Sequence, residues 1–115
     1  MPPSFVRHMM PQPFDNQIEI PPSFLALFIP HGRSRPTVAE AVIVARYEQC
    51  EDMACMLVER ANTLVFKEDF ARAEVLDRCR QGLLVDGSDF TVAEATWVIH
   101  RLAELLEWPP LAPAD

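Results

Sequence analysis

Two arginines in a short linker are the first residues whose types and spacing could do chemistry. Arg33 and Arg35 flank Ser34 and are followed by Pro36 and a segment with the pattern of a helix. The first turn of a helix has free backbone N–H groups and a dipole that favours negative charge, so arginines beside it can hold a phosphate or carboxylate. Arg33 and Arg35 are therefore the candidate anion-binding residues, with an ordinary solvated loop as the alternative.

A second candidate combines His100 with a cysteine. His100 can activate a thiol only if the fold brings it to Cys50 or Cys79, which are distant in the sequence. The three cysteines, Cys55 included, have no CxxC spacing, and each falls within a predicted helix. We expect all three to be buried or half-buried core residues in a reducing compartment, rather than redox or metal-binding groups.

The common nucleotide-binding and hydrolytic motifs are missing from the sequence. None of its three glycines directly precedes the single lysine, Lys67, so a Walker A loop is excluded. HExxH, GxSxG and GxGxxG are also absent. Helical di-metal sites use Glu-x-x-His pairs, and no histidine here follows a glutamate by three positions. We therefore expect no catalytic centre, metal or cofactor, and we interpret Glu48, Glu51 and Asp52 as a solvated acidic face.

The composition describes a folded, acidic protein. Hydrophobic residues make up 50% of the 115 residues, and the mean hydropathy is +0.03, which argues against disorder. The formal net charge of −7 disfavours nucleic acid as a partner and gives solubility or attraction to a basic protein surface. No run approaches the roughly 18 apolar residues of a membrane span, and the N-terminal stretch lacks the apolar core of a signal peptide. We expect a cytoplasmic protein.

The element that must position these groups is one long amphipathic helix, predicted from about residue 37 to 64. Thr37 and Glu40 have the spacing of a capping box, and neither glycine nor proline interrupts the predicted helix. Met53 and Met56 widen its apolar stripe, which serves as an intrachain core or as the seam of a homodimer. The stripe and the residues that broaden its first turns are Ile43, Tyr47, Cys50, Ala54, Leu57, Ala61 and Leu64, with Val38, Val42 and Ala45.

Two shorter helices are predicted after it, at about 68–84 and 92–107. Thr91 and Glu94 repeat the capping box in a second TVAEA segment, and Pro109 and Pro110 stop the last helix. The inner face of the first comprises Phe70, Ala73, Leu76, Cys79 and Leu83. The stripe of the second comprises Val92, Ala95, Val98, Ile99, Leu102, Leu105 and Leu106.

A short helix is predicted before the long one, at about 22–29. Phe24, Leu27 and Phe28 share one of its faces, which packs between the longer helices or docks on a partner. The proline-rich residues 1–17 are expected to be flexible, residues 18–108 to form a single helical domain, and residues 109–115 to form a tail.

Three groups of residues carry a resemblance: Gln17-Ile18-Glu19-Ile20-Pro21 with Ser23-Phe24, Arg46-Tyr47-Glu48 with Cys50-Glu51-Asp52, and Arg78-Cys79 with Gly82-Leu83-Leu84. On these residues the chain resembles small uncharacterised bacterial helical proteins labelled "ATPase with chaperone activity", over most of Gln17 to Trp108. The resemblance implies an accessory partner of a chaperone-type ATPase. It carries over no site residues, because none of the shared stretches is a catalytic motif.

The whole sequence predicts an all-α protein, a small bundle of three main helices with a short N-terminal helix. Without catalytic motifs, we expect a non-enzymatic interaction or adaptor module that binds another protein or a second copy of itself. The alternative is a small ligand-binding or enzymatic helical protein that uses Arg33 and Arg35 or a cysteine–histidine site. The candidate interface residues are Phe24, Leu27, Phe28, Met53 and Met56.

Overall fold

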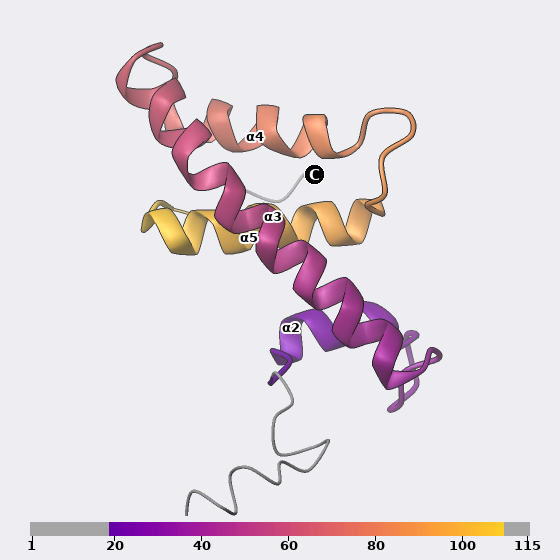
Figure 1. Ribbon diagram of the computed structural model, residues 1–115. Coiled ribbons are helices and arrows are strands. Elements are labelled where there is room, and N and C mark those ends of the chain that lie inside the picture. Colours follow the sequence, from indigo (N-terminus) through magenta and orange to yellow (C-terminus); the bar gives the residue numbers. More distant parts are fainter. Residues whose placement is uncertain (1–18, 110–115) are drawn as a thin grey trace, which may run out of the picture.

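The computed structural model describes residues 19–109, which form helices joined by loops and contain no strand (Figure 1). This confirms the predicted bundle of three main helices with a short N-terminal helix. The predicted flexible segment 1–17 and the tail after residue 109 lie outside the described residues. The elements are α2 (Pro22–Leu25) with the 3-10 turn η1 (Ala26–Phe28), α3 (Glu40–Phe66), α4 (Arg72–Leu83) and α5 (Val92–Leu106).

Helix α3 is the axis of the bundle and runs diagonally across α4 and α5 (Figure 1). It packs mainly against α5, and α4 contacts both of these helices. Three fully buried small residues, Cys50, Ala54 and Ala61, form its inner stripe and let the neighbouring backbones come close. Its 27 residues span roughly 40 Å at about 1.5 Å per residue, which leaves part of its outer surface without a neighbour among the described residues.

The start of α3 differs from the prediction, because Thr37 forms no capping box. Its N–H group donates a 3.0 Å hydrogen bond to the carbonyl oxygen of Phe28, and its hydroxyl donates to the same oxygen at 3.5 Å. The helix therefore begins at Glu40, with Ala39 at the N-cap and no side-chain hydrogen bond capping it. Val38, Val42 and Ala45 are exposed, so the first turns of α3 do not belong to the core as expected.

Helix α4 begins four residues later than predicted. Asp69 has a φ of 64°, and this left-handed conformation breaks the helical path between α3 and α4. The later start changes which residues face the core. Ala73, expected on the inner face, is exposed, whereas Val75 is fully buried.

The capping box predicted for α5 is present. The Thr91 hydroxyl accepts a 3.0 Å hydrogen bond from the Glu94 N–H group, and a Glu94 carboxylate oxygen accepts one of 3.1 Å from the Thr91 N–H group. Val92 was expected in the apolar stripe of α5 but is 64% exposed. The core side of α5 consists of Ala95, Trp97, Val98, Ile99, Leu102 and Ala103.

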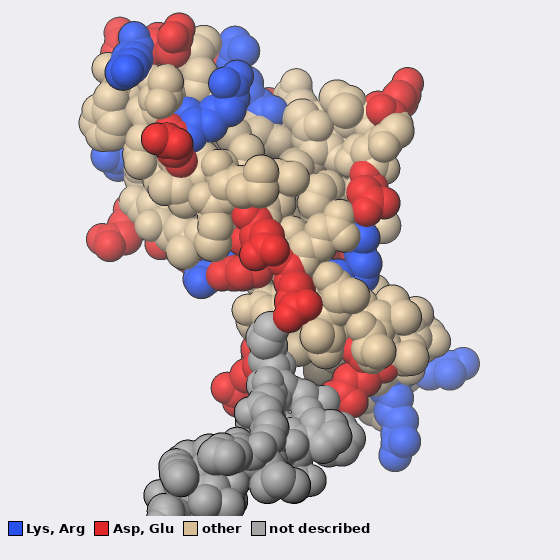
Figure 2. Space-filling model, in the orientation of Figure 1, with Lys and Arg blue, Asp and Glu red and all other residues tan. Residues whose placement is uncertain are grey.

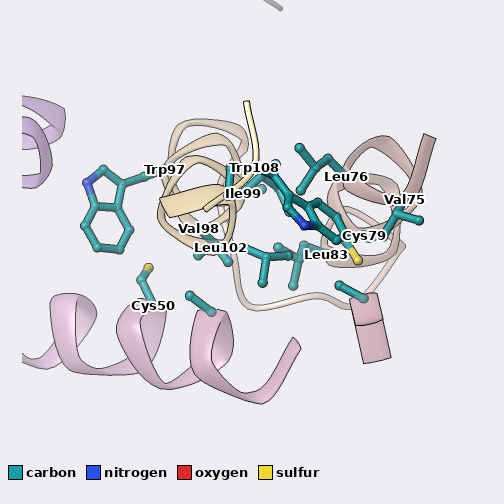
Figure 3. Packing of buried hydrophobic residues seen from close by; sticks show 14 of the residues in the cluster. Cys50, Val75, Leu76, Cys79, Leu83, Trp97, Val98, Ile99, Leu102 and Trp108 are labelled. Carbon is teal, nitrogen blue, oxygen red and sulfur yellow. The ribbon is translucent and has the colours of Figure 1, made fainter. Parts of the chain in front are cut away.

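The hydrophobic core lies where the three main helices meet. Figure 3 shows Trp108 between Leu76 of α4 and Ile99 of α5, while Cys50 of α3 points toward Val98. At the other end, the Phe24 ring meets the rings of Tyr47 and Trp97 at centroid distances of 5.5 and 5.0 Å. Helix α2 is therefore attached to the bundle by an aromatic cluster.

Candidate functional site

An open apolar groove lies between α3 and α4. It has a volume of about 610 Å³. Several of its apolar side chains are only half-buried, and no residue of a third described helix lines the groove. Its lining residues are Met53, Leu57, Arg60 and Leu64 from α3, Arg78, Cys79, Gln81, Gly82 and Leu83 from α4, and Val85 after α4.

The apolar surface of the groove continues onto Met56 of α3. Val85 at one side of the groove is 60% exposed, and Met56, just outside the groove, is 70% exposed. Met56 neighbours the groove residues Met53 and Arg60 on the helix surface, because residues three and four positions apart share a face. The face in Figure 2 shows a broad uncharged area between Lys and Arg side chains at the upper left and acidic side chains lower along α3.

The two arginines that line the groove, Arg60 and Arg78, differ in their contacts with other described residues. Arg78 lies 4.3 Å from the centre of the Phe70 ring and forms an i,i+4 ion pair of 3.2 Å with Glu74. Arg60 is exposed and forms no ion pair or side-chain hydrogen bond with another described residue. This guanidinium at the edge of the groove favours a ligand that brings a carboxylate.

The most buried ion pair joins α3 to the start of α5. Arg46 donates two hydrogen bonds to Glu94, of 2.9 Å from Nε and 2.6 Å from Nη2, and a third of 2.7 Å to the carbonyl oxygen of Asp89. Burial acts to raise the pKa of Glu94, but the hydrogen bonds from Arg46 and Thr91 outweigh it and hold the pKa below its ordinary value. Arg46 is engaged in holding the capping box of α5, which indicates a structural role.

A second ion pair joins the same two helices further along. Arg101 donates to both carboxylate oxygens of Glu51, with the shortest distance 2.9 Å, and also to Glu104 at 3.1 Å. Of the three acids that the sequence groups together on α3, Glu51 is thus paired, while Glu48 and Asp52 are exposed. These contacts hold α5 in place across α3. They lie on the α5 side of α3, whereas the groove lies on its α4 side.

The predicted interface residues fall into two places. Phe24 is fully buried in the aromatic cluster, and Leu27 and Phe28 are half-buried beside it. Met53 is half-buried in the groove, and Met56 lies exposed next to it. Only Met53 therefore lines the groove, with Met56 beside it, and the Phe24 side chain packs within the chain itself.

The predicted anion-binding arginines lie on an exposed loop. Arg33 and Arg35 make no side-chain hydrogen bond or ion pair with another described residue. Because α3 begins at Glu40, four residues separate Arg35 from its first turn. The anion-binding role stays a prediction, and the groove is elsewhere.

The predicted cysteine–histidine site does not gain support from the arrangement. His100 is exposed and lines a pocket of about 320 Å³ with residues that include Ser23, Tyr47 and Trp97, and no cysteine lines this pocket. Burial raises the pKa of the Cys50 thiol to about 12, so Cys50 stays protonated at neutral pH. Burial also raises the pKa of Cys79.

The third cysteine corrects an expectation, because Cys55 is exposed on α3 rather than buried or half-buried. Cys50 and Cys79 are buried as predicted, and all three thiols are free. Within residues 19–109, no three histidine, cysteine or acidic side chains gather closely enough to hold a metal ion. None of the helices described here is both long and apolar enough to cross a membrane.

Comparison with known proteins finds no family model that matches the chain, and no curated protein or solved structure with significant similarity. The function is therefore inferred from the residues of the groove itself.

The α4 side of the groove was not predicted. From the sequence, Leu83 was predicted to lie in the core and Val85 in a turn. Only the packing of α3 against α4 brings them opposite Met53 and Leu57. The one available signal was that the apolar stripe of α3, widened by Met53 and Met56, is broader than a single neighbouring helix covers.

Proposed function

We propose that this chain is a non-enzymatic protein–protein interaction module, and that its binding site is the groove between α3 and α4. The observation that supports this is the open apolar groove, of which Val85 is 60% exposed, with Met56 70% exposed beside it. Exposed aliphatic side chains that adjoin an open apolar groove are typical of interaction sites, whereas single scattered ones are not.

The shape of the site suits an amphipathic helix as the ligand. A groove between two helices accepts the apolar side chains that a third helix presents at steps of three and four residues. Arg60, which has no ion-pair partner among the described residues, favours a ligand helix with an acidic residue beside its apolar stripe.

The polar groups of the chain support an adaptor rather than an enzyme. Arg46, Glu94, Glu51 and Arg101 are engaged in ion pairs between α3 and α5. Burial keeps the Cys50 thiol protonated, which makes it a poor nucleophile. The sequence resemblance makes a cytoplasmic chaperone-type ATPase the first partner to test.

A capture experiment with matched charge variants tests the proposal. Met56→Asp and Val85→Asp each place a carboxylate on the apolar surface, and Val92→Asp adds the same charge at a site that is 64% exposed on α5. The tagged wild-type chain and the three variants are used to capture partners from native lysate, with quantification by mass spectrometry. We expect capture to fall more than about tenfold for Met56→Asp and Val85→Asp but to be unchanged for Val92→Asp.

Circular dichroism spectra establish that all three variants keep the helical fold. Equal capture of the same proteins by the wild type and the two groove variants would show that the groove is not the binding site.

A further inference from the structure

We infer that the exposed apolar surface of α3 beside the groove binds a second copy of this chain, through antiparallel pairing of the two α3 helices about Met56. The inference rests on the proposed function, since it names the partner of the apolar surface that Met56 and the groove form together. Helix α3 itself has the features expected of the ligand, because Met53 and Met56 form an apolar stripe with Asp52 beside it. The surface that binds and the segment that is bound are thus the same exposed face of α3.

The charges on the outer face of α3 favour this orientation. Glu48 and Asp52 precede Met56, and Arg60 and Lys67 follow it. All four side chains are exposed, and none of them forms an ion pair with another described residue. The face is therefore acidic in its first half and, because Arg60 and Lys67 outnumber the exposed Glu59, net positive in its second half, with an exposed methionine between the halves.

A two-fold axis at Met56 brings opposite charges together. The residue four positions before the axis then faces the residue four positions after it, so Asp52 of each copy lies opposite Arg60 of the other. Lys67 of each copy comes within about one helical turn of Glu48 of the other. Parallel pairing would place Asp52 against Asp52 and Arg60 against Arg60, which is repulsive.

The apolar contacts fit the same axis. Met56 meets Met56 of the second copy, with Met53 of both copies beside it, and Glu59 contributes its methylene groups opposite Met53. Met56 lies ten residues before the end of α3, so the two helices overlap over about 20 residues, roughly 30 Å. Each copy gives and receives the same surface, so the pair is closed and does not extend into a filament.

Charge reversal with two forms of rescue tests the pairing. We measure the mass of the full chain by light scattering and sedimentation over a concentration series, for wild type, Asp52→Arg, Arg60→Asp and the double variant. We expect a dimer for wild type, and dissociation constants at least about tenfold higher for each single variant, because each replaces two attractive contacts per dimer by two repulsive ones.

Rescue distinguishes self-pairing from a general loss of binding. The double variant exchanges the two charges and regains the dimer. An equimolar mixture of the two single variants forms a heterodimer, because one copy then carries arginine at both positions and the other carries aspartate at both. Failure of both rescues would overturn the antiparallel arrangement, as would a Met56→Asp variant that still dimerises like wild type.

Disulfide crosslinking reports the orientation independently of charge. In a Cys55→Ser background, Met56→Cys is expected to crosslink two copies under a mild oxidant, since the axis passes through this position. Val42→Cys in the same background is the matched control on α3, and the antiparallel pair places its two thiols at opposite ends. Efficient crosslinking at position 42 would indicate a parallel pair and overturn the inference.

The mass measurement also separates self-pairing from the proposed function. A wild-type chain that stays monomeric up to millimolar concentration, while Met56→Asp still loses captured partners, overturns self-pairing and leaves the groove as a site for another protein.

Discussion

Glu94 has two roles at the residue scale, because one carboxylate both completes the capping box of α5 and pairs with Arg46. It is the only buried charged side chain among the described residues, with 4% of its surface exposed. A glutamine at this position can still accept the hydrogen bond from the Thr91 N–H group, since Glu and Gln both serve in a capping box. The variant Glu94→Gln therefore removes the ion pair while keeping the cap.

We predict that Glu94→Gln lowers the free energy of unfolding at pH 7 by about 2 kcal/mol, because hydrogen bonds to charged partners are worth about 1.5–3 kcal/mol. Denaturant titration followed by circular dichroism measures this. The matched control is Glu74→Gln, which removes an exposed i,i+4 ion pair with Arg78 and is expected to cost less than about 0.5 kcal/mol. Equal losses for the two variants would show that burial gives the Arg46 pair no added strength.

The pH dependence of stability has a defined sign. The pKa of Glu94 in the folded protein is below its ordinary value of about 4.5, so the unfolded chain takes up its proton first as the pH falls. The stabilisation is complete above this ordinary value and is lost as the pH falls through the folded pKa. Hydrogen bonds from Gln49 and Arg46 also lower the pKa of Asp89, so Glu94→Gln reduces the acid sensitivity without removing it.

At the scale of elements, two identical TVAEA segments have different structures. The segment at 91–95 forms a capping box, whereas in the segment at 37–41 the Thr37 N–H and hydroxyl both donate to the Phe28 carbonyl oxygen. We predict that Thr91→Ala lowers the free energy of unfolding by about 1 kcal/mol, the usual cost of a lost N-cap. Thr37→Ala is expected to change it by less than about 0.5 kcal/mol, as a surface substitution does.

Thermal and denaturant unfolding of the two variants measure the difference within one protein. The two substitutions are chemically identical and lie in identical local sequences, so each is the control for the other. Equal effects at positions 91 and 37 would mean that local sequence alone sets the cap, contrary to the contacts observed.

The two TVAEA segments also show how much of the structure the sequence could predict. Apolar spacing predicted α3, α4 and α5 with their ends within a few residues, because amphipathic helices are encoded locally. Contacts distant in sequence decided the rest. The Phe28 carbonyl oxygen accepts the hydrogen bond of the Thr37 hydroxyl, which therefore does not cap α3. Arg46 donates hydrogen bonds to Glu94 of the second capping box, 48 residues away.

The candidate groove was likewise predictable only in part from the sequence. Met53 and Met56 could be named from the sequence because they lie outside the stripe that one neighbouring helix covers. Leu83 and Val85 could not be placed opposite them, since the crossing of α3 and α4 depends on the turn at Asp69 and on Val75 taking the core position expected of Ala73. A helix pair defines a groove, and the sequence of either helix alone does not.

At the scale of the whole molecule, the three main helices share one core, so they are expected to unfold together. The cysteines report this, because Cys55 is exposed on α3 and Cys50, five residues before it, is fully buried against α5. We predict that a thiol reagent labels Cys55 at nearly the rate of an unfolded chain, and that Cys50 is labelled only through opening of the bundle. Peptide mass spectrometry after timed labelling resolves the two sites.

The dependence of Cys50 labelling on denaturant decides whether the bundle opens as one unit. If α3, α4 and α5 separate together, the free energy of opening at Cys50 equals the free energy of unfolding from circular dichroism, and both fall with the same slope as denaturant is added. Labelling of Cys50 that is faster and nearly independent of denaturant would show that α5 detaches from α3 locally. In that case the Arg46–Glu94 and Arg101–Glu51 pairs, which join these two helices, would not hold them together in the folded state.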